Sequence, residues 1–180
     1  MLTDGNPDSI TNAVCVQIAT EQTLPLRHSV LWPNMPVSHV YLPDDAQGLH
    51  LGAFVPSCDR PVAVISLFIE SVPICIDTAL THHGVEPVHV RFRKFACDPV
   101  YQGLGIGSRL LQYSKSVTRS ELNGTILWCD ARTSSSDWYT KRGFIRFGEK
   151  FFKGSVEYVR MYIDVGVSVP VQDDSTRARS

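Results

Sequence analysis

A glycine-rich turn between a predicted strand and a predicted helix limits the fold of this chain more than any other feature. The turn reads Gln102-Gly103-Leu104-Gly105-Ile106-Gly107, after an extended pattern at about 88–97 and before a helical pattern at about 106–119. The first N–H groups of a helix lack intrahelical partners and carry a partial positive charge, and glycines let an anion approach them closely. A strand, a glycine turn and a helix in this order predict a site for phosphate groups.

Two common phosphate motifs do not fit the spacing of this turn. A dinucleotide fingerprint needs a third glycine three residues after Gly105, where the chain has Ser108. A Walker turn needs Gly-Lys-Ser/Thr, where the chain has Gly107-Ser108-Arg109. The plain alternative is a helix that begins in a tight glycine turn and binds nothing there.

The remaining patterns predict one α/β domain of the α+β type. With 180 residues the chain suits a single core, and the domain is expected at 13–164, between a flexible leader (1–12) and a flexible tail (165–180). The segment 71–87 is long for a connection and contains His82 and His83; it is either a functional loop or a polar one. Strands are predicted at 13–19, 49–55, 62–70, 88–97, 125–129, 144–152 and 156–164, and helices at about 20–30, 106–119 and 134–141.

Composition argues against several classes of protein. A formal net charge of -1 gives no electrostatic reason to expect nucleic acid or a membrane surface as partner. The longest apolar run, at 62–69, is too short to cross a bilayer. The five cysteines are scattered, without the close pairs of metal sites, so they predict thiols in a reducing compartment and no metal. A cytoplasmic protein is expected.

Two motifs in the expected order resemble the GNAT superfamily of acyl-CoA-dependent N-acetyltransferases. The first is Gln102-x-x-Gly105-x-Gly107, and the second runs from Leu127-Trp-Cys-Asp-Ala-Arg132 to Trp138-Tyr-Thr-Lys-Arg-Gly-Phe144. The resemblance spans nearly all of the chain outside its ends. It implies a mixed, mostly antiparallel seven-stranded sheet that is splayed at its centre and flanked by helices.

The resemblance also implies that acetyl-CoA is the acyl donor. Pantetheine would lie in the splayed sheet against the backbone of Phe95 and Cys97, and the N–H groups of the turn would hold the pyrophosphate. Arg109 could add charge, although such a side chain more often points to solvent. The residues expected at the donor are Phe95, Ala96, Cys97, Gln102, Gly103, Leu104, Gly105, Ile106, Gly107 and Ser108.

Tyr139 corresponds to the tyrosine that protonates the departing thiolate in the family. A phenol of pKa about 10 is protonated at neutral pH and can donate, but Tyr139 could instead pack beside Trp138. The serines at 134–136 could touch pantetheine, with helix capping as the default interpretation.

The base is open, because Arg91 occupies the place of the family's strand glutamate. Water, Glu70 or the histidine pair could take the proton of the amine, and Glu70 could equally be a solvated strand end. A covalent intermediate on Cys97 or Cys129 is the weaker hypothesis, because no histidine lies near either in sequence, so direct transfer in a ternary complex is expected.

These inferences predict transfer of acetyl from acetyl-CoA to a primary amine of a small molecule. The alternatives are a protein or peptide amine as acceptor, or a CoA-binding regulatory module without turnover. A homodimer through the edge strands is open.

Overall fold

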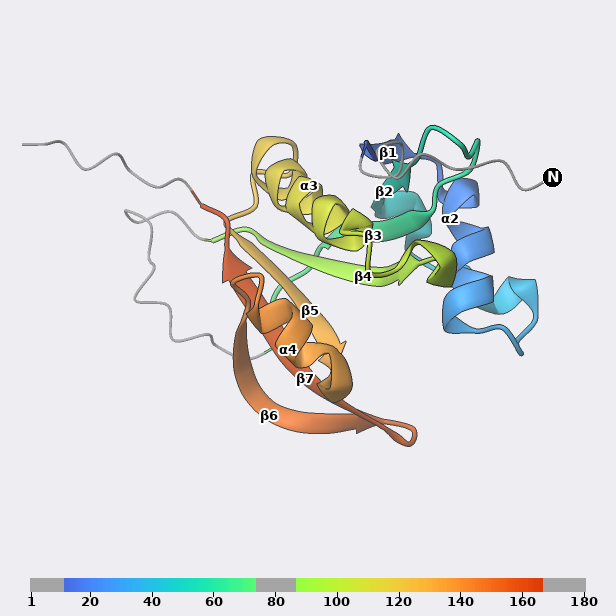
Figure 1. Ribbon diagram of the computed structural model, residues 1–180. Helices are drawn as coiled ribbons and strands as arrows, with labels where there is room; N and C mark the ends of the chain where they lie inside the picture. The colour runs from blue at the N-terminus through green and yellow to red at the C-terminus, as the bar shows by residue number, and fades with distance from the viewer. Residues whose placement is uncertain (1–11, 74–86, 167–180) are drawn as a thin grey trace, which may run out of the picture.

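The structure is a computed structural model, and it describes residues 12–73 and 87–166 (Figure 1). All of the predicted strands and helices lie within these two ranges. The predicted leader and tail fall almost wholly outside them, and so do His82 and His83 of the 71–87 segment.

In the described ranges, seven strands form one sheet in the order β1-β2-β3-β4-β5-β7-β6. All neighbouring strands are antiparallel except β4 and β5, which are parallel. The predicted mixed, mostly antiparallel sheet is therefore confirmed, and the predicted strand ends are correct to within three residues. The strands are β1 (Val14–Ile18), β2 (Leu49–Phe54), β3 (Ala63–Ile69), β4 (His89–Cys97), β5 (Ile126–Arg132), β6 (Ile145–Lys153) and β7 (Val156–Asp164).

The sheet is split at its centre, as predicted. β4 and β5 pair only from His89 opposite Ile126 to Arg91 opposite Trp128, and beyond this point they diverge (Figure 1). From Phe92 onward the edge of β4 that faces β5 has no ladder with that strand. Unpaired backbone groups at such an edge can bond an extended ligand.

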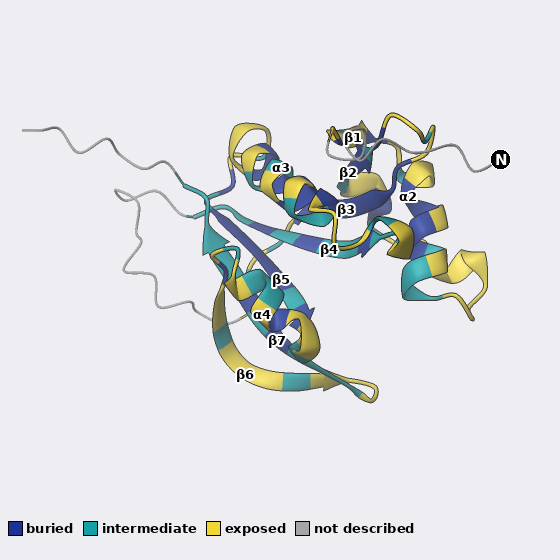
Figure 2. Cartoon of the chain, in the orientation of Figure 1, coloured by how far each residue is buried: buried dark blue, intermediate teal, exposed yellow. Residues whose placement is uncertain are grey.

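Helices cover both faces of the sheet because successive strand residues point to opposite sides. On β3, Ile65 packs in the core cluster that contains Leu110 of α3 (Ile106–Ser120). The neighbouring Val64 packs with Leu26 of α2 (Thr20–Leu26) on the other face. β3 is accordingly buried along nearly its whole length, whereas much of the edge strand β6 is exposed (Figure 2).

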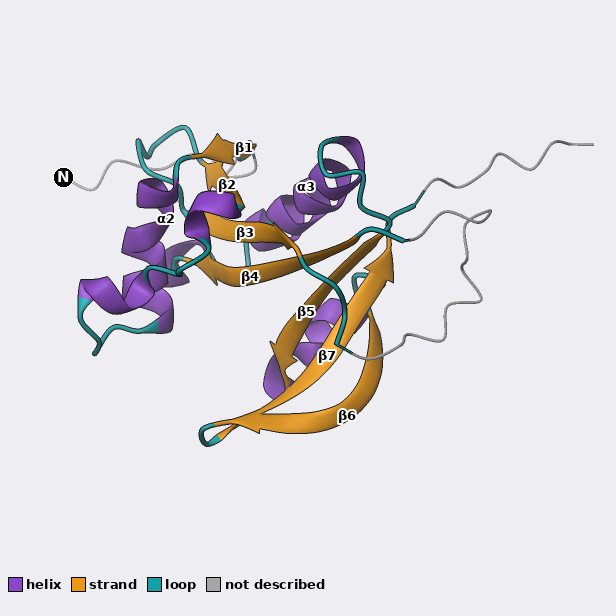
Figure 3. Ribbon diagram, turned by 180° about the vertical axis from the view of Figure 1, so that it is seen from behind, coloured by secondary structure: helices purple, strands orange, loops and turns teal. Residues whose placement is uncertain are grey.

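A short helix near the C-terminal strands completes the layer on the α3 side. Figure 3, seen from behind, shows α4 (Ser136–Thr140) on the far side of β5 and β7. Short π and 3-10 segments η1 (Arg27–Leu31), η2 (Val37–Val40), η3 (Asp45–Gln47), η4 (Pro99–Tyr101) and η5 (Thr133–Ser135) fill the connections.

A buried ion pair ties the segment after α2 to the sheet. The Arg27 side chain is fully buried and donates to both carboxylate oxygens of Asp45, at 2.7 and 2.9 Å, and to the Ser66 hydroxyl at 2.8 Å. Burial alone would raise the pKa of Asp45, but the hydrogen bonds from Arg27 and the Leu42 N–H, with the charge of Arg27, hold it below its ordinary value. The pairing fixes the α2–η3 region over the face of β3 that is remote from α3.

Four of the five cysteines lie in the described ranges, and Cys75 lies outside them. Cys15, Cys58, Cys97 and Cys129 are all free thiols. In the described ranges, no helix is long and apolar enough to cross a membrane.

Candidate active site

A cleft of about 580 Å³ joins the two motifs, which lie far apart in the sequence. One wall is the glycine turn with the end of β4, and the other is η5 with α4. The cleft is lined by Phe95, Cys97, Tyr101, Gln102, Gly103, Gly105, Gly107, Ser108, Ser134, Ser135, Trp138, Tyr139 and Arg142. Most of the residues predicted at the donor, together with Tyr139, are therefore brought to one cavity.

The glycine turn has the backbone shape that an anion site needs. Gly103 and Gly105 have φ values of +77° and +81°, a region that favours glycine, and Gly105 is the N-cap of α3. A Cβ built on either residue would meet nothing within 4 Å, so the space beside the turn is open. The N–H groups at the start of α3 lack intrahelical partners and lie at the positive end of its dipole. An anion is well accommodated there.

Three residues predicted at the donor do not line the cleft with their side chains. Ala96 is buried with the α2 side of the core, Ile106 is buried in the α3 core, and Leu104 is exposed. Their predicted contribution therefore rests on backbone groups alone. The Gln102 side-chain amide donates to the Cys97 carbonyl at 2.9 Å, which occupies one of the backbone acceptors predicted for pantetheine.

Arg142 is a cleft residue that sequence reasoning missed. Its Nε and Nη2 donate to the Ser108 hydroxyl at 2.9 and 2.7 Å, and its guanidinium lies 3.6 Å from the centre of the Trp138 ring. It therefore places a positive charge at the first turn of α3. Arg109, the candidate from the sequence, is not at the cleft; its Nη1 donates to the Ala13 carbonyl at 3.4 Å. The lysine-arginine-glycine segment before Phe144 was the only sequence signal for Arg142.

We expect an Arg142→Gln variant to bind acetyl-CoA about fivefold to tenfold more weakly, because it loses one charge beside the predicted pyrophosphate position. Isothermal titration calorimetry measures the change. Arg119→Gln is the matched control, since Arg119 is exposed at the opposite end of α3. Equal affinities in the two variants would contradict a role for Arg142 at the donor.

The Tyr139 ring packs among other aromatic rings beside the glycine turn. Its ring centre is 5.7 Å from Phe92, 5.0 Å from Trp138 and 5.7 Å from Phe144. Among the described residues its hydroxyl has no hydrogen-bond partner. Burial, with a smaller contribution from Cys129, raises the pKa of Tyr139 well above its ordinary value. The ring thus packs beside Trp138, as the packing interpretation predicted. The hydroxyl is protonated and has no hydrogen-bond partner among the described residues, as the role of proton donor requires.

The two thiols near the split are poor nucleophiles. Burial, and next the negative charge of Asp98, raises the pKa of Cys97; burial, and next Asp130, raises that of Cys129 much further. Both side chains are therefore thiols at neutral pH, and the thiolate is the reactive form. This favours direct transfer over a covalent intermediate.

The default prediction for the serines before α4 is wrong. Ser135 is the N-cap of α4, but its side chain makes no capping hydrogen bond. The Ser136 hydroxyl donates instead to the Thr133 carbonyl at 2.8 Å, within the preceding η5 turn. Ser134 and Ser135 line the cleft, which is the position that the alternative interpretation requires.

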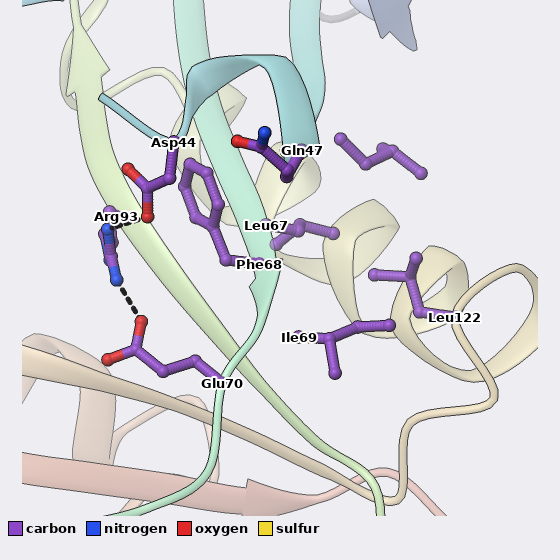
Figure 4. Close-up of a pocket in the computed structure, with 9 residues that line it drawn as sticks. Asp44, Gln47, Leu67, Phe68, Ile69, Glu70, Arg93 and Leu122 are labelled. Atoms are coloured by element: carbon purple, nitrogen blue, oxygen red, sulfur yellow. Dashed lines mark hydrogen bonds and ion pairs between the residues drawn. The ribbon is translucent and has the colours of Figure 1, made fainter. Parts of the chain in front are cut away.

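Glu70 lies at a second cavity, of about 470 Å³, and not in the cleft with Tyr139. Its Oε1 accepts from Arg91 Nη1 at 2.6 Å, and its Oε2 accepts from Arg93. Figure 4 shows Arg93 between Glu70 and Asp44 at this cavity. Both carboxylate oxygens of Glu70 are thus paired with guanidinium groups, and its side chain is 30% exposed. Glu70 does not line the cleft with Tyr139, and its role as a base stays a prediction.

Arg91 faces away from Tyr139. The adjacent Phe92 contacts the Tyr139 ring, and alternation along β4 turns Arg91 to the other side of the sheet. There Arg91 pairs with Asp130 of β5 as well as with Glu70. Sequence reasoning missed Asp130, which links the two strands where they separate.

Comparison with known proteins points to one family. The family description "Acetyltransferase (GNAT) domain" matches residues 81–165. An uncharacterized N-acetyltransferase, YitI of Bacillus subtilis strain 168, is 26% identical over 148 residues, which cover 81% of this chain and 91% of that protein.

Solved structures share the fold. FeeM, an N-acyl amino acid synthase from uncultured soil microbes, superposes with a TM-score of 0.63 at 12% identity, over 86% of this chain and 91% of that one. Escherichia coli ElaA gives a TM-score of 0.59 at 17% identity, over 84% and 97%. At these identities the likeness concerns the architecture, including the sheet with its flanking helices.

Proposed function

We propose that the chain is an acyltransferase of the GNAT superfamily, and that it moves the acetyl group of acetyl-CoA directly to a primary amine of a small molecule. The observation that carries the proposal is the single cleft that runs from the glycine turn to Tyr139. Binding of the donor alone would require only the glycine turn. Transfer of the acetyl group also requires a proton source beside the sulfur of acetyl-CoA.

In this proposal, different parts of the cleft bind the pyrophosphate, the pantetheine and the thioester of acetyl-CoA. The N–H groups from Gly103 to Ser108, with Arg142, bind the pyrophosphate. Pantetheine extends along the unpaired edge of β4, and the thioester comes to rest beside Tyr139 and Phe92. Orientation of the amine against a fixed thioester supplies much of the rate.

The reaction balances without a covalent enzyme intermediate. The amine, once it has lost a proton, attacks the thioester carbonyl; a nitrogen–carbon bond forms and the carbon–sulfur bond breaks. The departing CoA thiolate takes a proton from the Tyr139 hydroxyl. Water accepts both protons that the amine nitrogen loses, one from its ammonium form before attack and one after the nitrogen–carbon bond has formed. Solvent reprotonates Tyr139. We assign the base role to water because both oxygens of Glu70 are held by arginines. The products are the N-acetyl amine and CoA thiol.

The rate is expected to rise toward mildly alkaline pH, because only the neutral amine attacks. Below the pKa of the amine, kcat/KM should increase about tenfold per pH unit. The raised pKa of Tyr139 keeps its proton in place throughout that range, so no falling limb from this group is expected at mildly alkaline pH. Initial rates of CoA thiol release across the range test this, and a flat profile would show that deprotonation does not limit the rate.

Two measurements separate the proposal from its alternatives. Calorimetry with acetyl-CoA tests the donor, and absence of binding contradicts any function built on this cleft. Thiol release with a panel of small amines, compared with a library of peptides, tests the acceptor. Turnover with peptides alone would assign a protein or peptide amine. Tight binding without turnover in either set would assign a CoA-binding module.

A further inference from the structure

Among the described residues, a cluster of cations lies on the face of the split sheet that is turned away from Tyr139, and fewer carboxylates pair with its members. We define the cationic cluster as five residues of β4, β6 and β7. Three carboxylates, Asp44, Glu70 and Asp130, pair with its members. The cluster comprises Arg91, Arg93, Lys94, Lys153 and Arg160.

A β-bulge in β4 puts two consecutive cations on this face. Phe92 and Phe95 both contact aromatic rings of α4, so they point to the Tyr139 side. Arg93 and Lys94 lie between them and point to the other side, where regular alternation would allow only one of the two. The bulge is visible as a register shift between β3 and β4 and as a φ of 53° at Lys94, which is uncommon for a residue other than glycine.

Among the described residues, Lys94 is the one member of the cluster without a carboxylate partner. Its Nζ lies 3.9 Å from the centre of the Trp32 ring. Asp130 is shared by Arg91, by Lys153 at 2.7 Å and by Arg160 at 3.8 Å. The Nε atoms of three arginines, Arg91, Arg93 and Arg160, are buried without a hydrogen-bond partner in the described part of the chain.

The cluster borders the point where the acceptor must approach. Arg91 is the last residue of β4 that pairs with β5, and its ion pair with Asp130 crosses between the strands where they part. With CoA in the cleft on the Tyr139 side, the thioester carbonyl lies at this split, and the opposite face remains for the attacking amine. The cluster is therefore on the acceptor side.

We propose that the acceptor amine carries an anionic group, a carboxylate or a phosphate, which binds at Lys94 and the adjoining arginines. This inference rests on the proposed function, since it names the class of acceptor for the same site. An anionic group would neutralise the excess of cations and supply an acceptor for their donors.

The surroundings of Lys94 favour binding of an anion. Burial, and then the positive charges of Arg27, Lys153, Arg93 and Arg91, lower the pKa of Lys94 to about 8. The side chain is still mostly protonated at neutral pH, so it offers a partly desolvated cation among other cations. Binding of an anion relieves their mutual repulsion.

Pairs of amines that differ only in the anionic group test the proposal. The probes are the common amino acids against their carboxamides, and phosphoethanolamine against ethanolamine, with acetyl-CoA as donor and CoA thiol release as readout. We expect kcat/KM to be about tenfold or more higher for the anionic member of at least one pair. The comparison is conservative for the amino acids, because the amine of a carboxamide is less basic and a larger share of it is neutral.

The outcomes separate this inference from the proposed function. Turnover in which the neutral members equal or exceed the anionic ones overturns the anionic acceptor and leaves the transferase standing. Absence of turnover with every amine overturns both. A preference confined to phosphoethanolamine or to the amino acids identifies the anionic group as phosphate or carboxylate, respectively.

Substitution of Lys94 locates the preference. Lys94→Gln should raise KM for the anionic acceptor about tenfold and reduce the preference by the same factor, whereas Lys94→Arg should retain most of it. Lys150→Gln is the matched loss of charge, because Lys150 pairs with Glu157 on the exposed β6–β7 hairpin, and it should not change the preference. An unchanged preference in Lys94→Gln overturns the proposal. So does a loss of acetyl-CoA affinity without a change in preference, which would assign the cluster to the donor.

Discussion

A Tyr139→Phe variant is expected to lose about a hundredfold or more of kcat while it binds acetyl-CoA as tightly as the unaltered protein. The size follows from the contribution of a general acid, which is about 10²–10⁴ in rate. The substitution removes only the hydroxyl and leaves a ring that packs against Phe92, Trp138 and Phe144 as before. Because that hydroxyl has no partner among the described residues, no buried group loses a hydrogen bond.

Stability and binding controls make the result specific. Tyr113→Phe makes the same chemical change at a partly buried tyrosine of α3 that does not line the cleft, and it should leave kcat unchanged. Thermal unfolding should shift little in either variant. If Tyr139→Phe keeps its turnover, the thiolate takes its proton from another source, and Tyr139 serves only in packing.

A Gly105→Val variant is expected to weaken acetyl-CoA binding about a hundredfold. Gly105 has a φ of +81°, and a branched residue in this left-handed region costs about 1–2 kcal/mol. Its side chain would also project into the open space beside the turn, where the proposed pyrophosphate must contact the N–H groups at the start of α3. Strain and exclusion of the ligand act together, and calorimetry measures their sum.

Gly154→Val separates the two effects. Gly154 has a φ of +61° and open space around its Cβ position, but it lies in the turn between β6 and β7, away from the cleft. It should lose stability comparable to that of Gly105→Val and keep its acetyl-CoA affinity. A similar loss of affinity in both variants would mean that backbone strain alone explains the first, and the anion site would not be at the turn.

Local patterns predicted the architecture well because each depends on residues close together in the chain. Glycines at 103, 105 and 107 mark a turn wherever they occur, and the short apolar run of β3 indicates a buried strand independently of its neighbours. The joining of the turn with Tyr139 was predicted only through resemblance to a family. The structure brings the turn and Tyr139 to one cleft, whereas their separation in the sequence does not predict how close they lie in space.

The predictions that depended on a single side chain were less successful, because long-range contacts decide where such a side chain points. Arg109 was the candidate charge at the turn, but it reaches the Ala13 carbonyl, and Arg142 contacts Ser108 instead. Glu70 was a candidate base or a solvated strand end, and Arg91 and Arg93 of the next strand hold both of its oxygens.

By itself, then, the sequence determined the order of strands and helices and the glycine turn, since propensities and turn chemistry act within a few residues. The class of donor was predicted only through resemblance to a family. The tertiary structure alone decided which charges meet. The bulge that turns Lys94 to the side of Arg93 arises where β4 pairs with β3, and the link from Arg91 to Asp130 exists because β4 and β5 pair as far as Arg91 and then diverge. Pairing between strands is a property of the whole sheet, and among the described residues it gathers the cationic cluster on the face of the split that is turned away from Tyr139.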